Sequence, residues 1–237
     1  LGYFSPERVV SASAMGAWAV DAADVNGDGL VDLMAACGES DKITLYLNLG
    51  DGQFTQEQVI STLTDNAMDV STADLDGDGD EDVISCSAED DKVSWYANDG
   101  SGNFGAQTIV STAGGWPMSA VAVDIDNDLD LDLLTVTSED EALSWFPNQG
   151  NGTFSTRQVI TSSGAIEYLR ATFASDLDGD EDLDLLTATG MQDLIAWFEN
   201  NGSGGFGAQQ VISSAADNAG FVTAGDLDGD GDQDVIS

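Results

Sequence analysis

The stretch Asp74-Leu75-Asp76-Gly77-Asp78-Gly79-Asp80-Glu81-Asp82 is one of five similar acidic loops along the chain. The loops begin at Asp24, Asp74, Asp124, Asp176 and Asp226, and a phenylalanine recurs with them at Phe4, Phe54, Phe104, Phe154 and Phe206. Neighbouring loops are 50 residues apart, except that the fourth unit has two extra residues between Phe154 and Asp176. A fixed period of this length indicates a repeat architecture, and we expect the insertion in a loop.

Each repeat predicts four short strands and no helix, because no apolar period of 3.6 residues is long enough for one. In the second repeat the expected strands are 54–60, 68–73, 82–87 and 92–97. Four antiparallel strands in a repeat of this length are typical of a β-propeller blade. The sequence therefore predicts an all-β propeller of four-stranded antiparallel blades. A linear β-solenoid is the alternative, but its repeats usually have fewer strands and a shorter period.

We expect the whole chain, 1–237, to be one propeller domain or part of one. The expected blades span approximately 17–60, 67–110, 117–160 and 168–212, with 1–11 and 219–237 as partial blades. The last repeat has no counterpart of the strand at 92–97, so we expect further chain beyond Ser237; a closed five-bladed ring is the alternative. The recurring aromatic residues Trp95, Trp145 and Trp197 are expected to fill the core between blades rather than to bind sugars.

The acidic loops carry oxygen-bearing side chains at positions 1, 3, 5 and 9, and position 7 can add a backbone carbonyl. The expected ligands are Asp24, Asn26, Asp28, Leu30 and Asp32; Asp74, Asp76, Asp78, Asp80 and Asp82; Asp124, Asp126, Asp128, Asp130 and Asp132; Asp176, Asp178, Asp180, Asp182 and Asp184; and Asp226, Asp228, Asp230, Asp232 and Asp234. Ca²⁺ takes about 6–8 oxygen ligands in flexible geometry. The pattern therefore predicts up to five calcium ions. Zinc and redox metals are disfavoured, because the chain has no histidine and neither cysteine lies in a loop.

An EF-hand requires a glutamate at position 12 and flanking helices. The residues at that position are Ala35, Ser85, Thr135, Thr187 and Ser237, which excludes it. Solvated acidic turns are the simpler alternative, but five copies in register argue against it. At position 6, Leu129 and Glu181 replace the glycine of the other loops, where a tight turn favours positive φ. We therefore expect the third and fourth sites to be weaker or distorted.

The chain has 5 basic and 44 acidic residues, a formal net charge of −39. A compact state with this charge repels itself unless cations bind. Nucleic acids and anionic membranes require clusters of Lys and Arg that the chain lacks, so neither is an expected partner. No apolar run approaches the roughly 20 residues that span a bilayer, and no stretch resembles a signal peptide.

The two cysteines, Cys37 and Cys86, lie on equivalent strands of neighbouring repeats, one position apart. Neighbouring blades present facing surfaces to each other, so the two sulfur atoms could meet in a disulfide between blades. Two buried free thiols are the alternative.

The loop pattern D-x-[DN]-x-D-x-x-x-D, the segment W-[FY]-x-N-x-G-x-G-x-F at 95–104 and 145–154, and the 50-residue period resemble FG-GAP or VCBS repeats. These resemble the calcium-bearing blades of integrin α-chain propellers and of fungal and bacterial propeller lectins. The resemblance covers essentially the whole chain. It implies Ca²⁺ in a hairpin between the first two strands of a blade, and a propeller of about seven blades of which this chain is a piece.

The expected function is that of a non-catalytic, secreted or cell-surface module that mediates adhesion or assembly, directly or through fused or neighbouring domains. Its expected partner is an extracellular protein or glycan, because millimolar external calcium would keep moderate-affinity loops filled. A propeller lectin is the alternative, with Trp116 as the candidate sugar ligand, although a Trp that fills a blade contact is the favoured interpretation of this residue. Catalysis is not expected, since the chain has no histidine to act as a general base.

Overall fold

The computed structural model describes residues 7–162 and 168–237. These residues form four sheets, each of four antiparallel strands, followed by a two-stranded sheet. The first sheet contains β1 (Ala17–Ala23), β2 (Asp32–Cys37), β3 (Lys42–Tyr46) and β4 (Gln58–Ser61), and the second contains β5 (Ala67–Ala73), β6 (Asp82–Ser87), β7 (Lys92–Tyr96) and β8 (Thr108–Ser111). The third contains β9 (Pro117–Val123), β10 (Asp132–Thr137), β11 (Ala142–Phe146) and β12 (Gln158–Thr161), and the fourth contains β13 (Leu169–Ser175), β14 (Asp184–Thr189), β15 (Leu194–Phe198) and β16 (Gln210–Ser213). The last sheet pairs β17 (Thr223–Gly225) with β18 (Asp234–Ile236), and a short 3₁₀ helix, η1, spans Gly38–Ser40.

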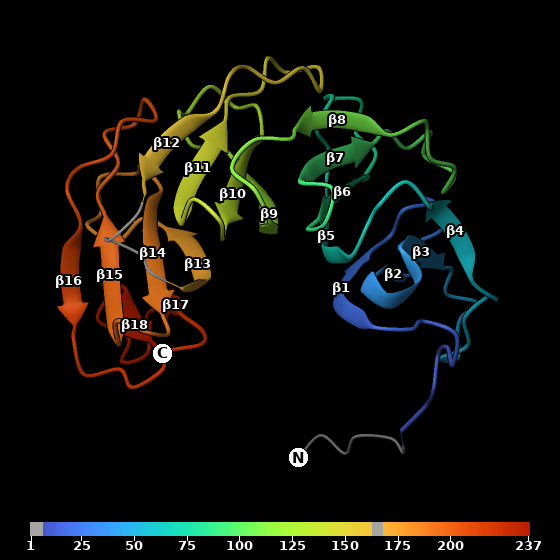
Figure 1. The fold of residues 1–237 in the computed structure, drawn as a ribbon, viewed down its shortest axis with the longest axis horizontal. Helices are drawn as coiled ribbons and strands as arrows, with labels where there is room; N and C mark the ends of the chain where they lie inside the picture. The colour runs from blue at the N-terminus through green and yellow to red at the C-terminus, as the bar shows by residue number, and fades with distance from the viewer. Residues whose placement is uncertain (1–6, 163–167) are drawn as a thin grey trace.

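The sheets are arranged in an arc, with each sheet forming one blade (Figure 1). Within each sheet the strands follow one another in chain order, so every connection is a hairpin. The first strands, β1, β5, β9 and β13, line the inside of the arc, and the fourth strands form its outer edge (Figure 1). β1 packs against β5, and β5 packs against β9. This arrangement confirms the predicted all-β architecture of four-stranded antiparallel blades.

The fourth strand of each blade is shorter than the sequence predicts. Phe54 forms only an isolated bridge with Asn48, and β4 begins at Gln58. The hydroxyl of Thr55 accepts the N–H of Leu47 at 3.0 Å, so a side chain takes the place of a backbone partner at this point. The same isolated bridge recurs at Phe104, Phe154 and Phe206.

The core lies between blades. Met34 and Ile43 of the first blade pack against Val83 and Tyr96 of the second. The predicted role of the aromatic residues is confirmed, because Trp95 and Trp145 are buried in the two following interfaces, and Trp197 packs partly buried against the next one.

Glycine permits a close approach in these interfaces. A Cβ atom added to Gly152 or Gly204 would collide with the indole of Trp95 or Trp145 of the preceding blade. The glycines of the W-[FY]-x-N-x-G-x-G-x-F segment therefore let each indole lie directly on the backbone of the next blade.

Cys37 and Cys86 do not form the disulfide that the sequence allowed, and the alternative of two buried free thiols is confirmed. Side chains on a strand alternate between its two faces, so a difference of one position reverses the face. Cys86 points toward the third blade, where it packs in the same cluster as Leu133. Cys37 packs with Ala35 and Tyr46, on the face of the first blade that lies away from the second. The two thiols are thus separated by both blades.

The structure describes the C-terminal end of the chain fully and the N-terminal end from residue 7. The outer strand expected near Phe4 lies outside the described residues, and residues 7–16 form no strand. At the other end, Val222 and Ala219 pack against Leu186 and Ile195 of the fourth blade, which places β17 and β18 on that blade's free face. None of the described residues forms a helix long and apolar enough to cross a membrane.

Candidate metal centres

Each acidic loop connects the first strand of a blade to the second, and its own carboxylates fold it. In the second loop, Oδ1 of Asp74 accepts the N–H of Gly77 at 2.8 Å, and Oδ2 accepts that of Gly79 at 2.9 Å. Asp78 in turn accepts the N–H of Asp80 at 3.0 Å. Short polar side chains that bond the backbone a few residues ahead stabilise tight turns. The loop therefore curls around its first carboxylate.

This curling brings carboxylates together. In four loops, three carboxylates each offer an oxygen, and the three oxygens lie within 4.8 Å of one another. The groups are Asp74, Asp76 and Asp78; Asp124, Asp126 and Asp132; Asp176, Asp178 and Asp180; and Asp226, Asp228 and Asp230. The first loop has Asn26 at the third position, and its amide donates a hydrogen bond to Asp28 at 3.1 Å. That loop therefore offers fewer negative charges to a cation.

The third loop tests whether a cation fits. Oδ1 of Asp124 and Oδ1 of Asp126 are buried and have no hydrogen-bond partner among the described residues. A buried carboxylate oxygen without a partner is costly. Burial and the nearby charges of Asp128 and Asp124 raise the pKa of Asp126 above its ordinary value. A hard cation held by oxygen ligands would remove both costs, and the donor set suits Ca²⁺.

The aspartate at position 9 also has a structural role that the sequence did not reveal. Asp82 is fully buried, and its two oxygens accept the N–H groups of Leu75 at 3.0 Å and Asn98 at 2.8 Å. It therefore joins the start of its loop to the hairpin between the third and fourth strands. Burial raises the pKa of Asp82 to about 6, although the two N–H donors oppose this shift. Asp132 is held in the same way and its pKa is also raised to about 6.

The residues at position 7 were expected to bind through their carbonyls, and that role stays a prediction. The side chains of Asp80 and Asp130 point toward a neighbouring hairpin: a Cβ added to Gly100 or Gly150 would lie 2.5 Å from the carboxylate of Asp80 or Asp130. Each of these glycines belongs to the hairpin that follows the third strand of the same blade. The acidic loop and this hairpin therefore contact each other in each of these blades.

At position 6 the expected backbone conformation is confirmed. Leu129 and Glu181 have φ of 75° and 74°, in the same left-handed region as Gly79 at 94°. Residues with a Cβ atom are strained there. The third and fourth loops therefore carry strain that the second loop avoids. Their weaker binding stays a prediction.

Sequence reasoning missed one residue that connects neighbouring loops. The side-chain amide of Asn98 donates to the carbonyl of Val25 in the first loop at 2.8 Å and to that of Glu81 in its own loop at 3.0 Å. Asn148 and Asn200 repeat this arrangement between the later blades. The signal was the asparagine of the W-[FY]-x-N segment, which follows the position-9 aspartates of the second, third and fourth loops by 16 residues. Adjacent loops are therefore linked through buried hydrogen bonds.

Trp116 lies away from the acidic loops. It is partly buried and has φ of 52°. Its backbone N–H donates a hydrogen bond to the carboxylate of Asp91 at 2.9 Å. Asn66 and Asn218 occupy the equivalent position with nearly the same φ and the same type of bond, so the backbone role does not need an indole. A sugar-binding role for Trp116 stays a prediction.

Comparison with solved structures identifies similar folds. An Agrocybe aegerita lectin that recognises non-reducing terminal N-acetylglucosamine superposes with a TM-score of 0.61 and 22% identity, covering 84% of this chain and 52% of the lectin. The V. cholerae biofilm matrix protein Bap1 superposes with a TM-score of 0.53 and 19% identity, covering 87% of this chain and 30% of Bap1. The chain thus spans about half or less of the length of these proteins, and at such identity the likeness concerns the fold.

A search of curated proteins found no match to the sequence. The model of the FG-GAP-like repeat matches four times, at residues 24–85, 75–135, 130–187 and 176–237. Each match contains at least one complete acidic loop, and together the matches include every loop from the first to the fifth. The chain belongs to the FG-GAP-like repeat family.

Proposed function

We propose that this chain is a calcium-binding propeller module that acts outside the cell in adhesion or assembly. The observation that carries the proposal is the third loop, where buried oxygens of Asp124 and Asp126 have no partner among the described residues. The loop also brings Asp132 into the same group. A divalent cation at this point would satisfy both oxygens and offset the repulsion among the carboxylates.

The bound calcium would stiffen the arc as well as each loop. The second residue of a loop offers its carbonyl to the asparagine of the next blade, as Leu75 does to Asn148 at 2.8 Å. That asparagine also donates its N–H to Asp132 at 2.8 Å. Ordering one loop therefore positions a contact to its neighbour, and the whole series of blades becomes more rigid when the loops are filled.

An extracellular location agrees with this use of calcium, since extracellular modules commonly bind it with dissociation constants of about 10⁻⁴–10⁻³ M. The fold similarity to a biofilm matrix protein and to a lectin supports a protein or glycan partner. Nucleic acid and membrane insertion are not part of the proposal, and neither is catalysis. A lectin is the second candidate function, and the similarity to the Agrocybe aegerita lectin favours it.

The proposal is tested by thermal unfolding in millimolar calcium and in chelator. A site held at about 100 times its dissociation constant stabilises the fold by about 2.7 kcal/mol, so each filled site should raise the melting temperature by roughly 5–10 °C. The control is a monovalent salt at matched ionic strength, because any salt screens a net charge of −39. Equal melting temperatures in calcium and in this control would contradict the proposal.

A further inference from the structure

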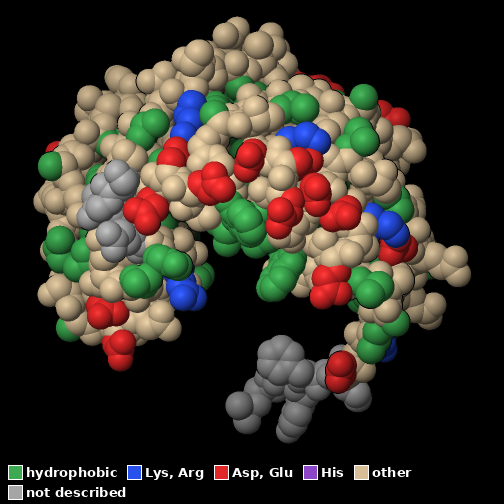
Figure 2. All heavy atoms as spheres, viewed as in Figure 1, with side chains coloured by type: hydrophobic (Ala, Val, Ile, Leu, Met, Phe, Trp, Pro, Cys, Tyr) green, Lys and Arg blue, Asp and Glu red, His purple; other side chains and the backbone are tan. Residues whose placement is uncertain are grey.

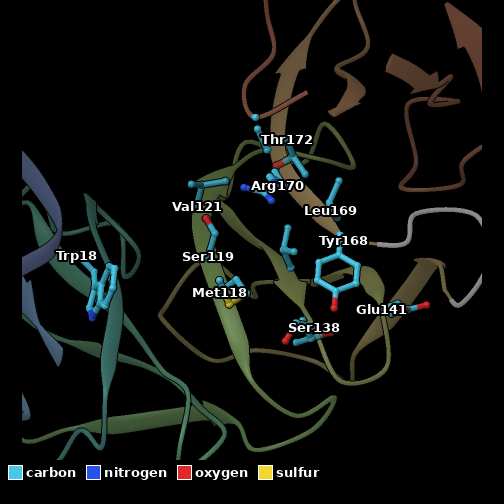
Figure 3. Close-up of a pocket in the computed structure, with 14 residues that line it drawn as sticks. Trp18, Met118, Ser119, Val121, Ser138, Glu141, Tyr168, Leu169, Arg170 and Thr172 are labelled. Carbon is cyan, nitrogen blue, oxygen red and sulfur yellow. The ribbon is translucent and has the colours of Figure 1, made fainter. Parts of the chain in front are cut away.

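A cavity of about 990 Å³ opens on the inside of the arc, away from the acidic loops. Its lining includes Trp18, Met118 and Arg170, each the second residue of an inner strand, whereas the acidic loops follow the last residues of these strands. Ser138 and Tyr168 also line the cavity (Figure 3). The cavity and the candidate calcium sites therefore lie at opposite ends of the inner strands. Its volume is in the range of small-molecule sites.

Two aromatic side chains are exposed in this cavity. Trp18 is 64% exposed and Tyr168 is 62% exposed. Figure 3 shows Trp18 on one side of the cavity and Tyr168 with Arg170 on the other, and the notch on the inside of the arc is visible in Figure 2. Exposed aromatic rings offer flat apolar surfaces to a ligand that has both an apolar face and a polar edge.

Arg170 is the cation of this cavity, and among the described residues it makes no hydrogen bond or ion pair. The other basic residues all have partners: Arg8 donates to the carbonyl of Asp51, Lys42 pairs with Glu57, Lys92 pairs with Asp90, and Arg157 pairs with Asp140. In a chain with 44 acidic residues, a guanidinium without a partner is notable. Its planar donors match a carboxylate bidentately.

Two glycines make room for Trp18 and Arg170. A Cβ atom added to Gly38 would lie 2.6 Å from the indole of Trp18, and one added to Gly190 would lie 2.5 Å from Nε of Arg170. Neither glycine has a positive φ, so the backbone does not require glycine there. The close approach of Trp18 and Arg170 to the backbone is therefore the reason for glycine at these two positions.

The other two blades support this interpretation. The residues that follow their second strands are Ala88 and Ser138, and the inner strands beside them carry Met68 and Met118. Glycine thus occurs in the two blades that place an indole or a guanidinium at the cavity. Both side chains lie against the backbone before any ligand arrives, which lowers the entropy cost of binding.

We propose that this cavity binds a short carbohydrate that carries one carboxylate, such as a uronic acid at the end of a glycan. The indole of Trp18 stacks on a sugar ring, Arg170 binds the carboxylate, and Ser138, whose side chain is exposed, bonds ring hydroxyls. A long polyanion does not fit, because a net charge of −39 repels it. The inference names a ligand and a site for the lectin candidate and rests on it, but it does not depend on the calcium loops.

The test is calorimetric titration of the calcium-loaded protein with a glucuronic acid disaccharide and with its neutral glucose counterpart. We expect the acidic sugar to bind more tightly than the neutral one, and Arg170→Gln to reduce its affinity by about tenfold to a hundredfold. Trp18→Ala should also weaken binding. The matched control Arg8→Gln removes the same residue type outside the cavity and should leave the affinity unchanged. Equal binding of the two sugars, no binding of the acidic sugar, or full affinity in Arg170→Gln overturns the proposal.

A second pair of variants tests the site without removing a contact group. Gly38→Ala and Gly190→Ala displace Trp18 and Arg170, so both should lower the affinity for the acidic sugar. Gly105→Ala is the control, because its new Cβ would lie 3.6 Å from the nearest atom. The calcium-dependent melting temperature, measured on every variant, reports the acidic loops separately. Loss of sugar binding with calcium stabilisation retained is expected for the two cavity variants, whereas full affinity in both would contradict the role of the glycines.

Discussion

Replacing Leu129 with glycine tests whether backbone strain distinguishes the third acidic loop from the second. Leu129 has φ of 75° and is 89% exposed. Its N–H donates to Oδ2 of Asp124 at 3.1 Å, a bond that glycine can also make. The equivalent residue in the second loop is Gly79, whose φ is 94°. The substitution Leu129→Gly therefore removes strain without removing a contact that the loop uses.

The magnitude follows from two opposing effects. A residue with a Cβ atom costs about 1–2 kcal/mol in the left-handed region. Glycine costs about 0.5–1 kcal/mol because it gains freedom in the unfolded chain. The side chain of Leu129 is almost fully exposed, so its removal loses little apolar burial. The expected net stabilisation is about 0.5–1 kcal/mol, which raises the melting temperature by roughly 1–4 °C in a chain of this length.

The reverse substitution, Gly79→Leu, tests the same balance in the second loop. A Cβ atom added to Gly79 would meet nothing within 4 Å, so no steric clash contributes. The same two effects apply with opposite sign, so we expect a net loss of about 0.5–1 kcal/mol of folding free energy. If the second loop becomes ordered only when it binds calcium, the same energy weakens calcium binding at that loop by roughly 2- to 5-fold.

The assay is thermal unfolding of both variants in calcium and in chelator, combined with calorimetric calcium titration. If the melting temperature changes both in calcium and in chelator, the strain is present in the folded loop itself. If the melting temperature changes only in the presence of calcium, the strain arises when the loop binds the ion. Unchanged stability and unchanged calcium affinity in both variants would refute the reasoning, because a positive φ would then carry no cost in these loops.

Three further predictions concern the junctions between blades and the buried carboxylates. Asn148→Ala should cost about 2–3 kcal/mol, because one buried and one partly buried carbonyl lose their donor. It should cost more than Asn48→Ala, whose amide donates to an exposed carbonyl of its own loop, and chemical denaturation of the two variants measures the difference. Gly152→Ala should destabilise more than Gly50→Ala, since both have positive φ but only Gly152 faces an indole; equal melting temperatures would contradict close packing. The pKa of Asp82 is raised from its ordinary value of 3.8 to about 6, so the folded chain in chelator keeps this proton at a pH where the unfolded chain has lost it. The resulting stability is fully present below pH 3.8 and is lost as the pH rises through about 6, so the melting temperature in chelator should fall over that pH range.

Several features could be predicted from the sequence because they depend on residues close together in the chain. The acidic loops are folded by carboxylates that bond N–H groups two to five residues ahead, such as Asp74 with Gly79. The strands follow from alternation and turn residues, and the left-handed φ of Leu129 follows from the glycines at equivalent positions. The sequence left open whether Cys37 and Cys86 meet, because the answer depends on a single position: the two residues lie on opposite faces of their strands.

The sequence by itself determined the repeat, the four-stranded blades and the acidic loops. These features depend on residues that are close together in the chain, and the same local pattern of residues recurs in each repeat. Only the tertiary structure decided which residues meet across blades. Asn98 bonds Val25, 73 residues away, and Trp18 and Arg170 share one cavity from blades that are not neighbours in the chain. The curvature and register of the blades set these contacts, and a local pattern contains neither. The asparagine links and the cavity became visible for this physical reason only once the blades were placed in space.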